Sequence, residues 1–375
     1  MRGGTFGRYL PSGHLVYVNR GTMFAVPFDL ERLEIRGSPV PVLEQVGYST
    51  LTGSAMFDFS DAGTLVYHSG GAAANGLRTV QWLDGTNKMQ PLLAKPDGYV
   101  YPRLSADGER VAFYMIDVWV YEGRRDTMTR LTFEGGIEPT WSPDGRYIVY
   151  SKPGEGMFWT RSDGAGKPQR LTQSKNAQHP NSFSPDGKRL AFGESSGDSG
   201  YDLFTVPIES DGSLLRAGKP EPFLRTQFNE RQPSFSADGH WLAYASDESG
   251  INQVYVRAFP DNGSRWQISN GGGVEPHFSR TGHELFFRTE GGQMVLVANY
   301  MVKGDSFVAD KPRLWSAKSI LASGTTSSYD VASDGKRIAA LMPAETPEAQ
   351  QALNHVIFLE NFFDELRRKV PQNRK

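Results

Sequence analysis

One short phrase recurs eight times along this chain and constrains its fold more than any other feature. It reads as an apolar or aromatic residue, then Ser, a small residue, Asp and Gly, followed by an apolar run. The clearest copies are Leu104-Ser-Ala-Asp-Gly108, Trp141-Ser-Pro-Asp-Gly145, Phe183-Ser-Pro-Asp-Gly187 and Phe235-Ser-Ala-Asp-Gly239. Weaker copies end at Gly13, Gly63, Gly282 and Gly335, so that the mean glycine-to-glycine spacing is 46 residues.

The chemistry of this phrase predicts β-hairpins. Asp-Gly between two apolar runs favours a tight turn, because Gly accepts positive φ and Asp bonds to its own backbone. Repeats of about 40–50 residues made of strands are typical of a β-propeller, with one four-stranded antiparallel blade per repeat. We predict an all-β fold in which one propeller with eight repeats spans residues 1–360. Seven closed blades plus a partial one is the alternative.

Composition agrees with this fold and excludes other classes. The 375 residues include 41 Gly, 7 Trp, 15 Tyr and 22 Phe, which suits many short strands joined by turns. The 40 basic and 42 acidic residues give a net charge of −2, which does not indicate a nucleic-acid partner. Without cysteine there is no disulfide and no thiolate zinc site. No apolar run reaches the ~20 residues of a membrane span, and Met1 does not begin a signal peptide.

The two ends of the repeat array give further expectations. The last repeat supplies strands over 336–342 and 355–360, and the start of the chain is short for the strand that would complete its blade. We therefore expect Met1 to be internal to a longer natural reading frame. Residues 361–375 are predicted to be a short helix and tail, with Phe362, Phe363, Leu366 and Val370 on one side. Docking on the propeller as a latch is preferred over an exposed partner-binding helix.

A candidate site follows from aligning the repeats on their turn glycines. The first strand of each blade is innermost, so its start, seven residues before the glycine, should surround one mouth of the central channel. Repeat 5 carries one extra residue, which brings His179 rather than Pro180 to this position. The predicted rim is Tyr101, Glu138, His179, Arg231, Gln232 and Glu275. Two carboxylates and an imidazole there could bind a cation, an amine or a polar small molecule. A solvated rim without a ligand is the alternative, and no metal, cofactor or catalytic residue is predicted.

Several phrases resemble a known family. Arg130-Leu-Thr132 with Trp141 to Tyr150, and Arg170-Leu-Thr172 with Phe183 to Phe192, look like the WD40-like PD40 repeat of the TolB family. Phe228-Asn-Glu-Arg-Gln-Pro-Ser-Phe235, Val254-Tyr-Val-Arg-Ala-Phe-Pro260 and Asn361-Phe-Phe-Asp-Glu-Leu-Arg367 are similar to the C-terminal propellers of bacterial serine/threonine protein kinases. The resemblance covers essentially the whole chain. As a fold signal it is specific, but propellers host unrelated activities.

The resemblance implies a sensing or scaffolding module rather than an enzyme. The chain has no Gly-rich nucleotide loop with a Val-Ala-Ile-Lys-type strand, no His-Arg-Asp and no Asp-Phe-Gly, so kinase activity does not carry over. The expected partner is a protein, a peptide or a small polar ligand, with a kinase domain upstream in the natural protein. One alternative is the propeller of a prolyl-oligopeptidase-like hydrolase, and another is a free-standing TolB-like periplasmic scaffold. An extracytoplasmic location is implied if a kinase tether exists, and a cytoplasmic one if Met1 is the true start.

Overall fold

The computed structural model describes residues 4–19, 21–48, 54–68, 77–196, 200–291, 294–321, 327–344 and 356–371. Contacts divide the chain into two compact units, each of which is described by itself. One unit comprises Met1–Arg78, Lys95–Gly98 and Pro343–Lys375, and the other comprises Thr79–Ala94 and Tyr99–Met342. Within the described ranges, no helix is both long and apolar enough to cross a membrane.

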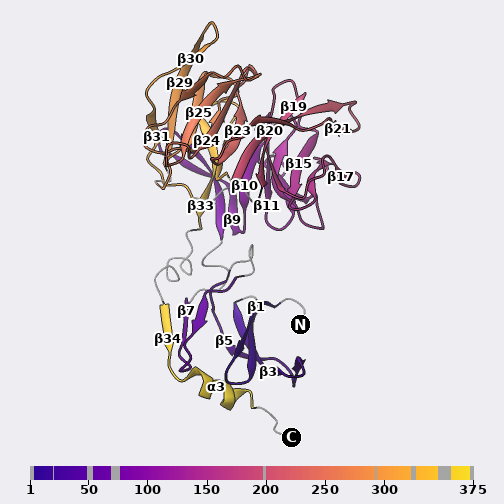
Figure 1. Ribbon diagram of the computed structural model, residues 1–375, viewed down its shortest axis with the longest axis vertical. Helices are drawn as coiled ribbons and strands as arrows, with labels where there is room; N and C mark the ends of the chain where they lie inside the picture. Colours follow the sequence, from indigo (N-terminus) through magenta and orange to yellow (C-terminus); the bar gives the residue numbers. More distant parts are fainter. Residues whose placement is uncertain are drawn as a thin grey trace. The chain divides into compact units, whose positions relative to one another are not determined.

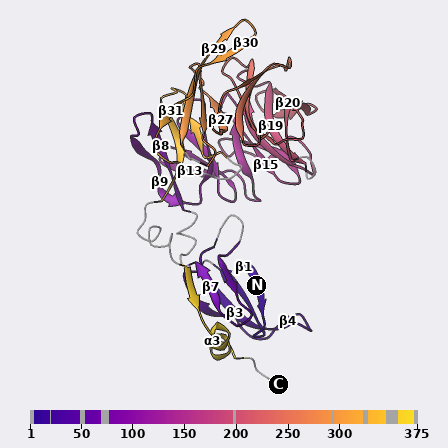
Figure 2. The same cartoon turned by 60° about the vertical axis from the view of Figure 1, so that its left-hand side comes forward.

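The larger unit consists of six antiparallel sheets (Figures 1 and 2). The first sheet is β10 (Val100–Leu104), β11 (Arg110–Tyr114), β12 (Val118–Glu122) and β13 (Thr127–Arg130). The second is β14 (Ile137–Trp141), β15 (Tyr147–Lys152), β16 (Gly156–Arg161) and β17 (Gln169–Arg170). The third is β18 (Ala177–Phe183), β19 (Arg189–Ser196), β20 (Gly200–Ser210), β21 (Leu215–Ala217) and β22 (Glu221–Leu224). The fourth is β23 (Glu230–Phe235), β24 (Trp241–Ser246), β25 (Gln253–Ala258) and β26 (Arg265–Gln267).

The last two sheets close the ring. The fifth is β27 (Val274–Phe278), β28 (Glu284–Arg288), β29 (Val295–Lys303), β30 (Ser306–Ala309) and β31 (Arg313–Ser316). The sixth has the order β32 (Tyr329–Val331), β33 (Arg337–Pro343), β8 (Arg78–Asp84) and β9 (Met89–Asp97). In this sheet β32 and β33 come from the C-terminal end of the unit's sequence, and β8 and β9 come from its N-terminal end. Because β32 also contacts both β27 and β10, the innermost strands follow one another in a closed circle.

The turn phrase has the structure that its chemistry predicts. In the copy at Gly145, the amide of Gly145 bonds to the carbonyl of Ser142 at 2.9 Å, and Gly145 has a φ of 67°. Ser142 Oγ donates to Asp144 Oδ1 at 2.6 Å and accepts the amide of Tyr147 at 3.0 Å. Side chain and backbone thus hold the hairpin together, and a residue with a Cβ would be strained at the glycine.

Buried apolar residues lie between successive sheets of the ring. One such cluster joins Tyr147, Val149 and Trp159 of the second sheet to Phe192 and Val206 of the third. The blades are therefore covered on both faces, which explains why their strands read as continuous apolar runs in the sequence.

The smaller unit contains two sheets and the helix. Its first sheet is β1 (Thr5–Leu10), β2 (His14–Asn19), β3 (Thr22–Asp29), β4 (Glu34–Ile35) and β5 (Val40–Leu43). Its second has the order β34 (Val356–Leu359), β7 (Leu65–His68) and β6 (Phe57–Phe59). Figure 1 shows β34, from the end of the chain, beside β7.

The C-terminal helix is confirmed as α3 (Phe362–Lys369), and it packs on this smaller unit. Phe362, Phe363 and Leu366 are buried in the same cluster as Val16 and Leu65. His14 Nε2 lies 2.7 Å from the carbonyl oxygen of Val370, which follows the helix. The helix therefore packs on the sheets of the smaller unit.

The structure confirms an all-β fold of antiparallel sheets, and eight sheets are described, one per repeat. The expected single unit over 1–360 needs correction, because six sheets form one unit and two belong to the other. The strand expected at 355–360 in the last repeat pairs instead with β7, in the second (residue 355 lies outside the described residues). The reason is that the phrase marks only the first two strands of each blade and carries no information about which segment lends the outer two.

Candidate functional site

The residue seven positions before the turn glycine occupies a β-bulge. Pairing shifts register at this point, for example between Ile137 and Thr140 of β14. Tyr101, Glu138, Gln232 and Glu275 have φ values between 55° and 59°. Non-glycine residues adopt this left-handed conformation at a cost of roughly 1–2 kcal/mol, so the surrounding structure must hold the bulge in place.

The structure brings five of the six predicted rim residues together. Tyr101, Glu138, His179, Arg231 and Gln232 line one small pocket. Its volume is about 20 Å³, which fits a single water molecule. Three of its buried polar atoms have no hydrogen-bond partner: His179 Nε2, Arg231 Nε and Asn181 Oδ1. These atoms are one imidazole nitrogen, one guanidinium N–H donor and one amide oxygen acceptor.

Glu138 sets the charge of this rim pocket. Its Oε2 lies 2.7 Å from His179 Nδ1, and its side chain is only 4% exposed. Burial by itself lowers the pKa of His179, but the hydrogen bond and charge of Glu138 outweigh burial and raise this pKa above its usual value. The guanidinium of Arg231 stacks on Tyr201, 4.4 Å from the ring centre. The pocket thus holds one internal ion pair and one additional cation.

Glu275 does not line this small pocket. Its Oε1 accepts from Nε and Nη2 of Arg288 at 3.0 and 2.8 Å, and its Oε2 accepts the amide of Ser328 at 2.8 Å. The carboxylate is 0% exposed and its charge is matched by Arg288. Its connection to the rim is the bond from its amide to Gln232 Oε1 at 2.8 Å. Glu275 joins neighbouring blades, and its carboxylate is already satisfied.

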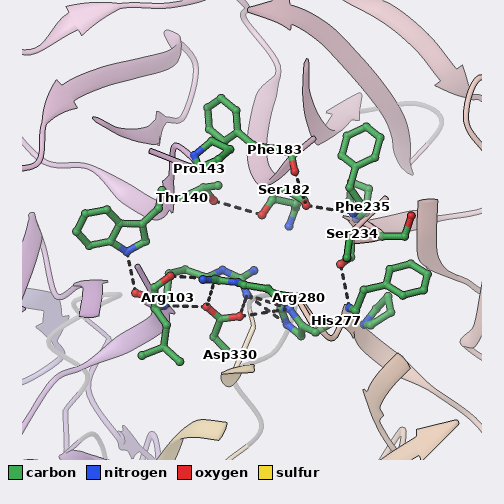
Figure 3. Close-up of a pocket in the computed structure, with 18 of the residues that line it drawn as sticks. Arg103, Thr140, Pro143, Ser182, Phe183, Ser234, Phe235, His277, Arg280 and Asp330 are labelled. Atoms are coloured by element: carbon green, nitrogen blue, oxygen red, sulfur yellow. Dashed lines mark hydrogen bonds and ion pairs between the residues drawn. The ribbon is translucent and has the colours of Figure 1, made fainter. Parts of the chain in front are cut away.

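A larger cavity of about 250 Å³ lies inside the ring (Figure 3). Of the six predicted rim residues, Gln232 and Glu275 line it. Its wall carries one residue from each innermost strand, five positions before each turn glycine. These residues are Arg103, Thr140, Ser182, Ser234, His277 and Asp330. Aromatic walls come from the next position along, as at Trp141, Phe183 and Phe235. The small residues of the turn phrases also line the cavity. Two of them, Ala106 and Ala237, are exposed.

The six wall residues connect the blades in sequence around the ring. Ser182 and Ser234 accept the amides of Phe235 and Phe278 at 3.1 and 3.4 Å. Asp330 Oδ2 accepts the amide of Leu104 at 2.7 Å, which joins the sixth blade to the first. Three further links complete the circle: Trp141 Nε1 to the Arg103 carbonyl at 2.9 Å, Thr140 Oγ1 to the Pro180 carbonyl at 3.0 Å, and His277 Nε2 to Ser327 Oγ at 3.0 Å.

Cations gather on one side of this cavity. Figure 3 shows Arg103, Arg280 and His277 around Asp330. Nη1 of Arg103 lies 3.9 Å from Asp330 Oδ1, and Nη2 of Arg280 lies 3.5 Å from Oδ2. Burial, followed by the charges of Arg103 and Arg280, holds the pKa of His277 well below its usual value. His277 is therefore neutral at pH 7, and two guanidinium groups share one carboxylate.

Ser327, His277 and Asp330 suggest a nucleophilic triad, but their bonds do not fit one. His277 Nδ1 lies 3.7 Å from Asp330 Oδ1, beyond hydrogen-bond distance. The two oxygens of Asp330 already accept the amides of Leu104 and Val331. Ser327 Oγ donates its one proton to the carbonyl of Tyr329 at 2.9 Å, so this hydroxyl does not donate to His277. The arrangement favours recognition over covalent chemistry.

Sequence reasoning found this cavity only in part because it selected the bulge position. Of the residues seven positions before the turn glycines, Gln232 and Glu275 line the cavity, whereas all six residues at an offset of five do. Reading the same alignment two residues further on would have placed Arg103, His277 and Asp330 together. Among the described residues, no group of three or more His, Asp or Glu side chains is arranged to hold a metal ion.

A closed ring of antiparallel blades around a lined cavity defines the larger unit as a β-propeller. Among solved structures, the chain is similar to the putative TolB of Agrobacterium tumefaciens. That match has a TM-score of 0.52 and 17% identity, and it covers 71% of this chain and 98% of the other. No protein-family model matches the chain.

Curated sequences agree with this fold. The chain is 27% identical over 234 residues to the Tol-Pal system protein TolB of Francisella tularensis subsp. mediasiatica, with 55% of this chain and 52% of that protein covered. The chain thus spans about half the length of the curated relatives it matches. It is also 24% identical over 205 residues to the uncharacterized peptidase YuxL of Bacillus subtilis, covering 41% of this chain and 31% of that protein. The chain contains a TolB-like β-propeller, and the association with a kinase stays a prediction.

Proposed function

We propose that this chain is a non-catalytic binding module that recognises a segment of a partner protein in its propeller cavity. The single observation that carries the proposal is the cavity itself. Each of the six blades contributes a wall residue to it, and its walls combine aromatic surface with a few polar groups. Such a combination is typical of recognition sites, in which apolar area supplies affinity and polar groups fix orientation.

Two further observations support a binding module, the first for a protein partner and the second for a role without catalysis. The curated relatives are by name components of the Tol-Pal system, so similar propellers function within a set of proteins. The contacts of Ser327, His277 and Asp330 described above occupy the atoms that acyl transfer would need. The predicted rim site of Tyr101, Glu138, His179, Arg231, Gln232 and Glu275 remains a second candidate on the same channel. Its pocket suits a water-sized guest, so we assign it a supporting role.

Peptide selection with a blocked cavity tests this function. Ala106 is exposed and lines the cavity, so Ala106→Trp should fill it without disturbing the core. Ala165 is also exposed but lies in the turn after β16, away from the cavity, so Ala165→Trp is the matched control. Peptides selected from a random display library on the wild type should bind Ala165→Trp equally and Ala106→Trp at least about tenfold more weakly. Equal binding to all three proteins would contradict a ligand site in the cavity.

The match to a peptidase favours a second candidate, in which this propeller accompanies a hydrolase domain. A fluorophosphonate probe tests whether a hydrolase site lies within this chain itself, because it labels only an activated serine. The binding module predicts no labelling that depends on Ser327. Labelling of the wild type that disappears in Ser327→Ala would instead indicate catalysis within this chain.

A further inference from the structure

We infer that the cavity of the propeller binds a carboxylate carried on a short apolar or aromatic body. This inference rests on the function proposed above and names the chemistry of the ligand. The carboxylate would lie between Arg103 and Arg280, and the apolar body would lie against the aromatic wall that includes Trp141 and Phe183. The source of the carboxylate is either a peptide segment or a free small acid, since both present the same groups.

The first observation is that positive charge exceeds negative charge in the cavity lining. Its lining includes two guanidinium groups, Arg103 and Arg280, and two carboxylates, Asp330 and Glu275. Glu275 is neutralised by Arg288 through two hydrogen bonds. Asp330 is therefore the one carboxylate of the lining that the two arginines share. Its distances to them, 3.9 and 3.5 Å, are those of loose ion pairs rather than of bidentate ones. The lining thus carries one excess positive charge.

The second observation is one unused hydrogen-bond donor, on Arg103. Arg103 is 7% exposed, and its buried Nε has no hydrogen-bond partner. Leaving a buried donor of a charged group unsatisfied is unfavourable, so an acceptor that reached it would gain a charge-assisted bond. Asp330 does not bond to this Nε; its oxygens accept the amides of Leu104 and Val331 and Nη2 of Arg280. An external carboxylate in the cavity would bring an acceptor beside this guanidinium.

The third observation concerns how a ligand could enter the cavity and how large it could be. Arg280 is 36% exposed, so its guanidinium is within reach of solvent, whereas Arg103 is deeper. A ligand that entered past Arg280 would thus meet a second cation inside. A volume of about 250 Å³ is small compared with the roughly 300–1,000 Å³ of typical ligand pockets. It suits one amino-acid residue or a small aromatic acid, and it is too small for a folded domain to enter.

Matched acids and amides test the inference with the full chain. The small probes are 3-phenylpropanoate and 3-phenylpropanamide, which have the same body with and without the charge. The peptide probes are acetyl-Gly-Gly-Phe with a free C-terminal carboxylate and its C-terminal amide. By isothermal titration calorimetry at low salt, we expect each acid to bind at least about tenfold more tightly than its amide. Whichever acid binds more tightly identifies the source of the carboxylate.

Variants assign that preference to the cavity. Arg280→Gln should remove most of the preference for the acid, and Arg280→Lys should restore part of it because the charge returns. The matched control is Arg313→Gln, since Arg313 is also exposed but lies on β31 and does not line the cavity. Thermal unfolding of each variant shows that it is folded. Ala106→Trp should abolish binding of both acids.

Two results would overturn the assignment: equal affinity for acid and amide, or no binding of either acid at about 10 mM. These failures are distinguishable from failure of the proposed function. If selected peptides without an acidic group bind the wild type and not Ala106→Trp, the cavity is a binding site but the carboxylate assignment is wrong. If Ala106→Trp affects no ligand at all, the proposed function is wrong as well.

Discussion

At the scale of single residues, two buried carboxyl groups in the propeller have surroundings with opposite effects on protonation. Glu138 has a hydrogen-bonded partner in His179, so its environment favours a charged pair. Glu230 is 1% exposed, and its Oε2 has no hydrogen-bond partner, so its environment favours the neutral acid. The two groups therefore affect stability in opposite ways as the pH changes, and each gives a testable prediction.

We predict that Glu138→Gln destabilises the protein mainly at low pH. Glu138 raises the pKa of His179 above its unfolded value of about 6.5. Because the pKa of His179 is higher in the folded than in the unfolded state, its protonation stabilises the folded protein fully at pH values below the unfolded pKa. This stabilisation is lost as the pH rises through the folded pKa. The loss in free energy of unfolding should be about 1–3 kcal/mol at pH 6 and smaller at pH 9. Denaturant unfolding at both pH values measures it. A loss that does not change with pH, as expected for the exposed control Glu155→Gln, would contradict this role.

We predict the opposite behaviour for Glu230→Gln. Burial raises the pKa of Glu230 to about 7, and the carboxylates of Asp202, Asp247 and Glu248 add to this effect. In the unfolded chain the Glu230 carboxyl ionises above about pH 4.5, but in the folded protein it resists ionisation up to about pH 7. Glu230 therefore lowers the free energy of unfolding increasingly as the pH rises toward and beyond 7. Glutamine resembles the neutral acid, and this variant should be more stable than wild type at pH 8, by at most about 3 kcal/mol. Thermal unfolding at pH 5 and pH 8 tests this prediction. Equal stability of the two proteins at pH 8 would contradict a raised pKa for Glu230.

At the scale of elements, the sequence determines hairpins better than it determines their bulges. The phrase at Gly145 predicts the turn between β14 and β15, because its Ser, Asp and Gly form their bonds within one hairpin. The bulge at Glu138 depends on packing against neighbouring blades, and no local residue type indicates it. Five of the six predicted rim residues therefore line the small pocket, and Gln232 and Glu275 alone of the six line the larger cavity.

The C-terminal helix was predicted from its apolar face, and its packing gives a prediction at this scale. Leu366 is 0% exposed and lies in the core of the smaller unit. Leu366→Ala should destabilise that unit by about 2–4 kcal/mol, because truncation removes apolar contact and leaves a cavity. Hydrogen exchange resolved by residue should show faster exchange in β2 and β7 than in β15 and β24. Uniformly faster exchange in all four strands would contradict an effect confined to the smaller unit.

At the scale of the whole molecule, the eight repeats could be counted from the sequence, but their grouping could not. The turn phrase is the same in both units, so it does not reveal that β8 and β9 complete the blade of β32 and β33. Nor does it reveal that β34 completes the sheet of β6 and β7. Such pairings between distant segments arise from packing of the complete chain. The larger unit is thus inserted within the sequence of the smaller one.

This grouping predicts that residues 78–343 fold without the rest of the chain. The excised segment contains all six blades, including the pair that closes the ring, and its ends lie close together, since the amide of Ala344 bonds to the carbonyl of Leu77 at 3.3 Å in the full chain. We expect a monomer with one cooperative unfolding transition, within about 5 °C of a transition in the full chain. Calorimetry on both proteins measures this. An excised segment that is unfolded would contradict a closed ring.

The central claim is that the propeller cavity is the ligand site, and a crystal structure of the chain with a bound selected peptide tests it most directly. The account predicts peptide density inside the cavity, against the aromatic wall and within hydrogen-bond distance of Arg280. Peptide bound on the outer faces of the blades, with the cavity unchanged, would contradict it.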